Sequence, residues 1–123
     1  MSKTSALRAV VQQLLSACPG GTYHRRAPDD MPYPYKVFSL RSTVYTGARD
    51  DLDLCVDVWD LGADPKRSEE IADAVERALD GVNAPQLGIL PTFFRDSRIP
   101  VEDPNKDIQH IQLHFQVQLY EEE

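Results

Sequence analysis

The sequence predicts an α+β domain: a mainly antiparallel β-sheet with two helices packed on one face, in the order α-β-β-α-β-β. Two segments carry apolar residues at helical spacing and are followed by glycine. Four segments are rich in strand-forming residues, and in two of these apolar and polar side chains alternate. No internal repeat or low-complexity linker divides the chain, so we expect one domain over residues 1–123.

The first helix is predicted over residues 5–18, with Thr4 or Ser5 as its N-cap and the Pro19-Gly20-Gly21 run as its stop. Its apolar stripe starts almost at the N-terminus, which favours a helix packed in the core over a helix that binds a partner. The stripe consists of Leu7, Val10, Val11, Leu14, Leu15 and Cys18. A polar, proline-rich loop is expected from Gly20 to Pro34.

A β-hairpin is predicted next. Its first strand runs from Tyr35 to about Val44, and a turn follows at Thr46–Asp50. In its second strand, around residues 52–59, apolar side chains alternate with acidic ones, a cysteine and Trp59. Such alternation is typical of a strand with one buried face.

The second helix is expected to start at Asp64-Pro65, with the aspartate as N-cap, and to end at Gly81. Its buried stripe is Ile71, Ala72, Val75, Ala78 and Leu79. A strand over 87–94 contains Pro91 and is therefore expected at a sheet edge or at a bulge.

The C-terminal part is expected to hold an irregular loop over 95–106, a last strand over 111–119 and a solvated Glu121–Glu123 end. The long loops at 20–34 and 82–107 have no periodic pattern. We expect them to be mobile in the free monomer and to mediate assembly.

Composition excludes several classes. The formal net charge of −7 and a pI near 4.9 argue against specific nucleic-acid binding, because an acidic domain repels phosphate. No apolar run is long enough to span a membrane, and the N-terminus lacks the pattern of a signal peptide, so we expect a cytoplasmic protein. Cys18 and Cys55 read as two buried reduced thiols, with a disulfide as the less favoured alternative.

Neither a metal site nor a catalytic site is predicted. The acidic residues Asp50, Asp51, Asp53, Asp57, Asp60 and Asp64 lack calcium-loop spacing. On a strand, four-residue spacing separates two side chains by about 13 Å, which also excludes joint zinc binding by His110 and His114. No nucleophile elbow, phosphate-binding glycine loop or Cys-x-x-Cys pair is present, so no cofactor is expected.

The last strand presents Gln112, His114, Gln116 and Gln118 on its second face. This face is expected either to contact a second subunit or to meet water, as one face of an antiparallel sheet commonly does.

Five stretches carry a family resemblance: "SALRAVVQQLL", "YPYKVFSL", "TGARDDLDLCVDVWD", "SEEIADAVERALDG" and "DIQHIQLHFQVQLYEEE". In this order they resemble the tail-completion (tail-terminator) proteins of long-tailed, siphovirus-type bacteriophages and prophages. The match covers most of the chain and is weakest at 19–31 and 82–107. These are core patterns, so they indicate a fold family more than individual functional residues.

The resemblance implies a structural assembly protein, not an enzyme. Such a protein caps the tail tube and joins it to the head as a homo-oligomeric ring, which is a hexamer in related folds. It is assembled in the host cytoplasm and ends in the virion. Its partners would be itself, tail-tube proteins and head-connector proteins, and DNA would pass through the ring. Two alternatives stay open: another neck or head-side connector (minor capsid) protein, and a small bacterial ligand-binding or enzymatic domain with a pocket in the 82–107 loop.

A closed ring requires two different contact patches on each subunit. We expect one patch on the sheet, near Trp59 or the Gln112–Gln118 face. The other is expected on a loop that carries Arg25 and Arg26, or Arg95 and Arg98.

Overall fold

The computed structural model describes residues 2–121; Met1, Glu122 and Glu123 lie outside the described residues, so of the predicted C-terminal end only Glu121 is described. The elements, in chain order, are α1 (Lys3–Ser16), β1 (Gly21–His24), β2 (Tyr35–Tyr45), β3 (Asp50–Leu61), α2 (Lys66–Leu79), β4 (Ile89–Val101) and β5 (Ile108–Glu121). Neither described helix has the length and apolarity needed to cross a membrane.

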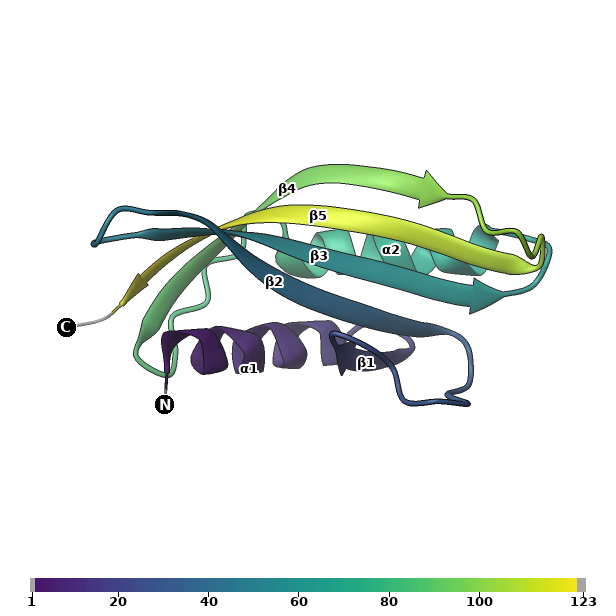
Figure 1. Cartoon of the computed structure of the whole chain (residues 1–123), viewed down its shortest axis with the longest axis horizontal. Helices are drawn as coiled ribbons and strands as arrows, with labels where there is room; N and C mark the ends of the chain where they lie inside the picture. The colour runs from purple at the N-terminus through teal and green to yellow at the C-terminus, as the bar shows by residue number, and fades with distance from the viewer. Residues whose placement is uncertain (1, 122–123) are drawn as a thin grey trace.

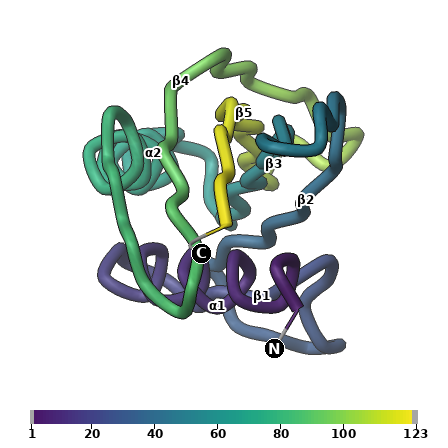
Figure 2. The backbone as a smooth tube through the Cα atoms, turned by 90° about the vertical axis from the view of Figure 1, so that its left-hand side faces the viewer, coloured from purple at the N-terminus to yellow at the C-terminus, as the bar shows by residue number. Residues whose placement is uncertain are grey.

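The strands form one sheet in the order β1-β2-β3-β5-β4 (Figure 1). All neighbouring strands are antiparallel except β1, which pairs in parallel with β2. Both helices lie on the same side of the sheet, as the end view in Figure 2 shows. The predicted fold class is confirmed, as are the β2–β3 hairpin and the edge position of the strand that contains Pro91.

The core lies between the helices and one face of the sheet, which we call the inner face. Along β3 every second residue is buried from Asp50 to Asp60, and the residues between them are partly exposed. Because strand side chains alternate between faces, this pattern separates an apolar inner face from a polar outer face. The inner-face residues of β3 and β5 in the core are Leu52, Leu54, Val56, Val58, Ile111, Leu113, Phe115, Val117 and Leu119.

The predicted helices are present with small shifts. Helix α1 starts two residues before the predicted range, because Ser2 is the N-cap and its hydroxyl accepts the amide hydrogen of Ser5 at 3.0 Å. Its predicted stripe is buried except for Leu14, which is only partly buried against the core. In α2 the cap position is Pro65, while Asp64 accepts the amide hydrogen of Lys66 at 2.9 Å.

The expectation of an irregular loop over 20–34 was wrong at its start, where Gly21–His24 forms β1 beside β2. This makes the order α-β-β-β-α-β-β. The strand has only four residues, too few to show a periodic pattern. Gly20 has φ +88° where the chain turns into it, and a Cβ there would lie 3.0 Å from the carbonyl oxygen of Pro34.

The expectation of an irregular loop over 95–106 was also wrong, because β4 continues to Val101. A bulge between Arg95 and Ser97 shifts the register against β5. The bulge breaks the alternation of side chains, so the second half of β4 does not show a strand pattern. Within the predicted loop 95–106, only residues 102–106, in the turn between β4 and β5, lack strand structure.

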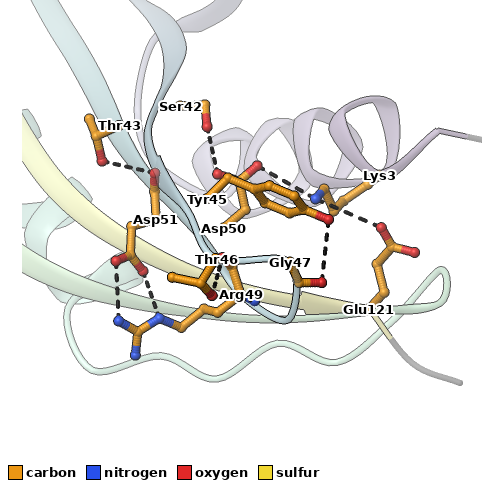
Figure 3. Close-up of polar contacts among 10 residues, drawn as sticks. All are labelled: Lys3, Ser42, Thr43, Tyr45, Thr46, Gly47, Arg49, Asp50, Asp51 and Glu121. Atoms are coloured by element: carbon orange, nitrogen blue, oxygen red, sulfur yellow. Dashed lines mark hydrogen bonds and ion pairs between the residues drawn. The ribbon is translucent and has the colours of Figure 1, made fainter.

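Two aspartates on the inner face attach the two ends of β3 to the two helices. At one end Asp50 lies 3.6 Å from the ammonium nitrogen of Lys3 in α1 and accepts a hydrogen bond from Ser42 at 2.6 Å (Figure 3). At the other end Asp60 accepts a hydrogen bond from Nε of Arg67 in α2 at 2.8 Å. Two residues of the acidic run, Asp50 and Asp60, therefore take part in packing the helices against the sheet.

Candidate functional site: the outer face of the sheet

The outer face carries a hydrogen-bonded row of polar side chains across β3 and β5. Asp57 accepts from Nε2 of His110 at 2.7 Å and from Gln112 at 3.2 Å. Nδ1 of His114 lies 3.2 Å from the carboxylate of Asp53. Gln112 joins the two halves, because its amide oxygen lies 2.9 Å from Nε2 of His114. The two histidines thus have separate carboxylate partners, as strand spacing requires.

Trp59 ends this row. Its ring stacks on His110 with centroids 3.7 Å apart and planes 13° from parallel. Burial alone would raise the pKa of Asp57, but hydrogen bonds from His110 and Gln112 outweigh burial and lower this pKa below its ordinary value. Asp57 therefore stays ionised, and the row presents a fixed, pre-organised polar surface.

Cys55 lies in the middle of the row but is a poor nucleophile. Burial, and then the nearby carboxylates of Asp57 and Asp53, raise the pKa of its thiol to about 12. A thiol in this state carries almost no thiolate at neutral pH, and the thiolate is the reactive form. Cysteine, histidine and aspartate side chains are therefore neighbours in this row, but the cysteine is not activated as a nucleophile. Their presence does not indicate a catalytic site.

The structure brings Arg25 and Arg26 to the same place as Trp59. These three residues line one hollow of about 580 Å³ at the end of the sheet where β2 begins and β3 ends. We call it the arginine hollow; it is lined by Arg25, Arg26, Ala27, Pro28, Asp29, Asp30, Met31, Tyr33, Tyr35, Val37, Asp57 and Trp59. Both arginines are exposed. Trp59 was expected on one contact patch and Arg25 and Arg26 on the other, so residues expected on two different patches share one surface.

Arg95 and Arg98 lie elsewhere. Arg98 pairs with Asp73 and Glu76 of α2, each at 2.6 Å, and Arg95 also pairs with Glu76. Across β4 and β5, Arg95 is opposite Phe115 and Arg98 is opposite Leu113, which are inner-face residues. These arginines hold the edge strand against α2, so their guanidinium groups are already engaged within the subunit.

The remaining predicted contact residues lie on the outer face beside β4. Gln116 is exposed and donates to Asp96 at 3.5 Å, while Gln118 is partly exposed opposite Thr92. Beside them β4 exposes the apolar side chains Phe94 and Ile99. The Gln112–Gln118 row is therefore continuous with an apolar strip on the edge strand.

The structure explains the acidic run without a metal ion. Asp51 pairs with Arg49 at 2.9 Å, and each of the other predicted acidic residues has one of the partners given above. Within residues 2–121 no group of three or more His, Cys, Asp or Glu side chains converges as metal ligands would. The acidic residues serve different faces because neighbours in a strand point in opposite directions.

Sequence reasoning missed the aromatic lining of the arginine hollow. The rings of Tyr33 and Tyr35 lie 5.2 Å apart, and Tyr23 meets Tyr35 edge-on at 6.2 Å. In the sequence, the "YPY" stretch predicts only the start of a strand. A second hollow of about 570 Å³ lies between the start of α2 and the β4–β5 turn, lined among others by Pro65, Pro100 and Lys106.

Comparison with known proteins agrees with the fold. The family described as "Tail completion protein gp17" matches residues 2–120. A chain in a solved structure of the virion of a native gene transfer agent (GTA) particle is similar, with a TM-score of 0.66 and 17% identity over 97% of this chain and 92% of that chain. At this identity the likeness shows the fold. Among curated proteins, none matches the sequence.

The family match over residues 2–120 defines the chain as a structural protein of the phage tail. More particularly, the chain belongs to the tail completion protein gp17 family. A structural family of this kind implies a non-enzymatic role.

Proposed function

We propose that this protein caps the phage tail tube and takes part in joining the tail to the head, as a closed ring of identical subunits that is most simply a hexamer. The observation that carries the proposal is the family match over residues 2–120, nearly the whole chain. The similar fold of a chain from a GTA virion supports it. The protein would assemble in the host cytoplasm and then remain in the virion, at the tail and neck.

The charge of the chain supports the same role. A net charge of −7 disfavours retention of DNA by the subunit surface. A ring through which DNA passes benefits from a wall that repels phosphate, because the DNA then slides without binding. Its protein partners would be further copies of itself, tail-tube proteins and head-connector proteins.

Deletion of the gene in the phage or prophage of origin tests the proposal. We expect filled heads and separate tails, some longer than normal, because nothing would stop tube growth or join the two parts. Complementation with the wild-type gene should restore joined particles. Tails of normal length that merely fail to attach would instead indicate another neck or head-side connector protein, and normal infectious particles would refute a role in assembly.

A further inference from the structure

The second half of β4 exposes three apolar side chains in a row. Phe94, Ile99 and Val101 are 41%, 46% and 36% exposed. The residues opposite them in β5 are, in the same order, Gln116, Gln112 and His110. Because directly opposite residues in paired strands point to the same face, the three apolar side chains lie on the outer face. We call this row the apolar strip; it is roughly 23 Å long at ~3.3 Å per residue.

Helix α1 has an exposed face that is nearly free of charge. Among its exposed residues Arg8 is the one with a charge, and the others are Thr4, Ala9, Gln13 and Ser16. Helix α2 differs, because all of its exposed residues are charged: Lys66, Arg67, Glu69, Glu70, Asp73 and Arg77. The water-facing side of a surface helix usually carries charges as α2 does, whereas depletion of charge is typical of the core of a protein interface. The exposed face of α1 therefore has the composition of a contact surface.

These two surfaces lie on opposite sides of the molecule. In both views α1 is at the bottom and the second half of β4 is at the top (Figure 1, Figure 2). Helix α1 runs along the strands, since Lys3 pairs with Asp50 at one end of the sheet and Gly21, just after the helix, is opposite Tyr35 at the other end. Its 14 residues span about 21 Å, close to the length of the apolar strip. A head-to-tail ring requires two such unlike surfaces on one subunit.

One unpaired charge lies near the middle of each surface, and the two charges are opposite. Arg8 is near the middle of α1. Asp96 is at the bulge in the apolar strip, where it accepts a hydrogen bond from Gln116 at 3.5 Å. Both are exposed, and within residues 2–121 neither forms an ion pair, whereas Arg95 and Arg98 beside the strip are engaged with α2. Opposite charges at corresponding positions favour one partner and one register.

From these observations we infer that the exposed face of α1 in one subunit packs on the apolar strip of the next copy of this chain. Ala9 and its neighbours cover Phe94 and Ile99, and Arg8 pairs with Asp96. The inner face of the same helix stays in the core of its own subunit, and the arginine hollow is not part of this contact. The inference rests on the proposed ring and specifies the seam between its subunits.

Cysteine crosslinking tests the seam directly. The background variant is Cys55→Ser, which leaves the buried Cys18 as the remaining native thiol. In this background, Ala9→Cys combined with Ile99→Cys should give a ladder of crosslinked species up to the full ring when a short bismaleimide is added, in solution or on purified tail tubes. Each new cysteine alone should give no dimer, because a head-to-tail seam joins position 9 to position 99. An equimolar mixture of the two single-cysteine proteins should give dimers and nothing larger.

The matched control combines Ala9→Cys with Leu61→Cys. Leu61 is 50% exposed, much like Ile99, but it lies in β3, two strands away from β4. Its thiol should therefore be as reactive as that of Ile99→Cys and still give no ladder. Circular dichroism confirms that each variant is folded.

Glutamate substitutions give an independent readout that needs no crosslinker. Ala9→Glu and Ile99→Glu each place a carboxylate without a partner in the seam, so we expect assembly to weaken by roughly tenfold or more. Leu61→Glu should assemble like the wild type. Sedimentation velocity over a range of concentrations and binding to purified tail tubes measure assembly.

The outcomes separate the seam from the ring. If the wild type never forms a defined oligomer, in solution or on tail tubes, the proposed ring is refuted and the seam with it. If the wild type assembles but the double-cysteine variant gives no ladder, or if both glutamate variants assemble as well as the wild type, the ring stands and this seam is wrong. A dimer from either single cysteine would show a symmetric contact and would also contradict the seam. A ladder from the pair at positions 9 and 99, but not from the control pair, supports it.

Discussion

The ammonium nitrogen of Lys36, in β2, lies 2.7 Å from the carbonyl oxygen of Gly20, just beyond the end of α1. It also donates to the carbonyls of Pro19 at 2.7 Å and Cys18 at 3.3 Å. Lys36 is fully buried, and burial lowers the pKa of its side chain. The charge remains favourable here because carbonyls beyond a helix C-terminus lack helical partners and attract a cation.

Lys36→Met should therefore lower the free energy of unfolding by about 1–3 kcal/mol, since it keeps most of the side-chain volume but leaves buried carbonyls unsatisfied. Urea denaturation followed by circular dichroism measures the change. Lys66→Met, at an exposed position of α2, is the matched control and should have little effect. Equal stability of both variants would show that the three carbonyls do not depend on Lys36.

Leu15→Ala should cost about 2–5 kcal/mol of stability, because Leu15 is fully buried between α1 and the sheet. Leu14→Ala should cost clearly less, because Leu14 is only partly buried. Thermal melts of the two variants compare neighbouring leucines on the same helix. A larger loss for Leu14 would contradict the position of α1 on the sheet.

Asp60→Asn should lower the free energy of unfolding at pH 7 by about 1.5 kcal/mol, the lower end of the range for a hydrogen bond to a charged group, because the partner Arg67 is largely exposed. Hydrogen bonds from Arg67 lower the pKa of Asp60 in the folded protein below its ordinary value of 3.8. A depressed folded pKa stabilises the protein above the unfolded pKa, and this stabilisation is lost as the pH falls through the folded pKa.

The difference between the wild type and Asp60→Asn should therefore be constant near neutral pH and shrink below about pH 4. Urea denaturation at several pH values measures it. A difference that stays constant down to pH 2 would mean that the Asp60 carboxylate is not responsible.

Chelation of metal ions should leave the protein unchanged. The carboxylates of the acidic run are paired with lysine, arginine, histidine or backbone groups instead of converging on one point. We expect the same melting temperature and the same degree of assembly with and without EDTA. A shift of several degrees would reveal a metal site that forms between subunits.

The sequence predicts well those elements whose burial is regular. Both helices, the hairpin and β5 have periodic apolar residues, and the structure places them as expected. Periodicity could not reveal β1, which is short and polar, or the second half of β4, where the bulge near Arg95 interrupts the alternation. In both cases long-range pairing decides the conformation, and a single sequence does not show that pairing.

The candidate contact surface was predictable in its residue types more than in its geometry. Strand alternation correctly puts Trp59 and His114 on one face of the sheet. The position of Arg25 and Arg26 beside Trp59 depends on how the loop after β1 folds back, which no local pattern encodes. The pairing of Arg98 with α2 is likewise a contact between segments distant in sequence.

The ion pair between Lys3 and Glu121 shows that the first and last described elements end side by side. A purification tag or a fluorescent protein fused to either terminus would therefore lie near the end of the sheet where β3 begins. The β4–β5 turn around Asn105 lies at the opposite end of the sheet and is exposed. Because surface turns tolerate inserted sequence well, it is the better position for a label when the end of the sheet at Asp50 must stay unobstructed.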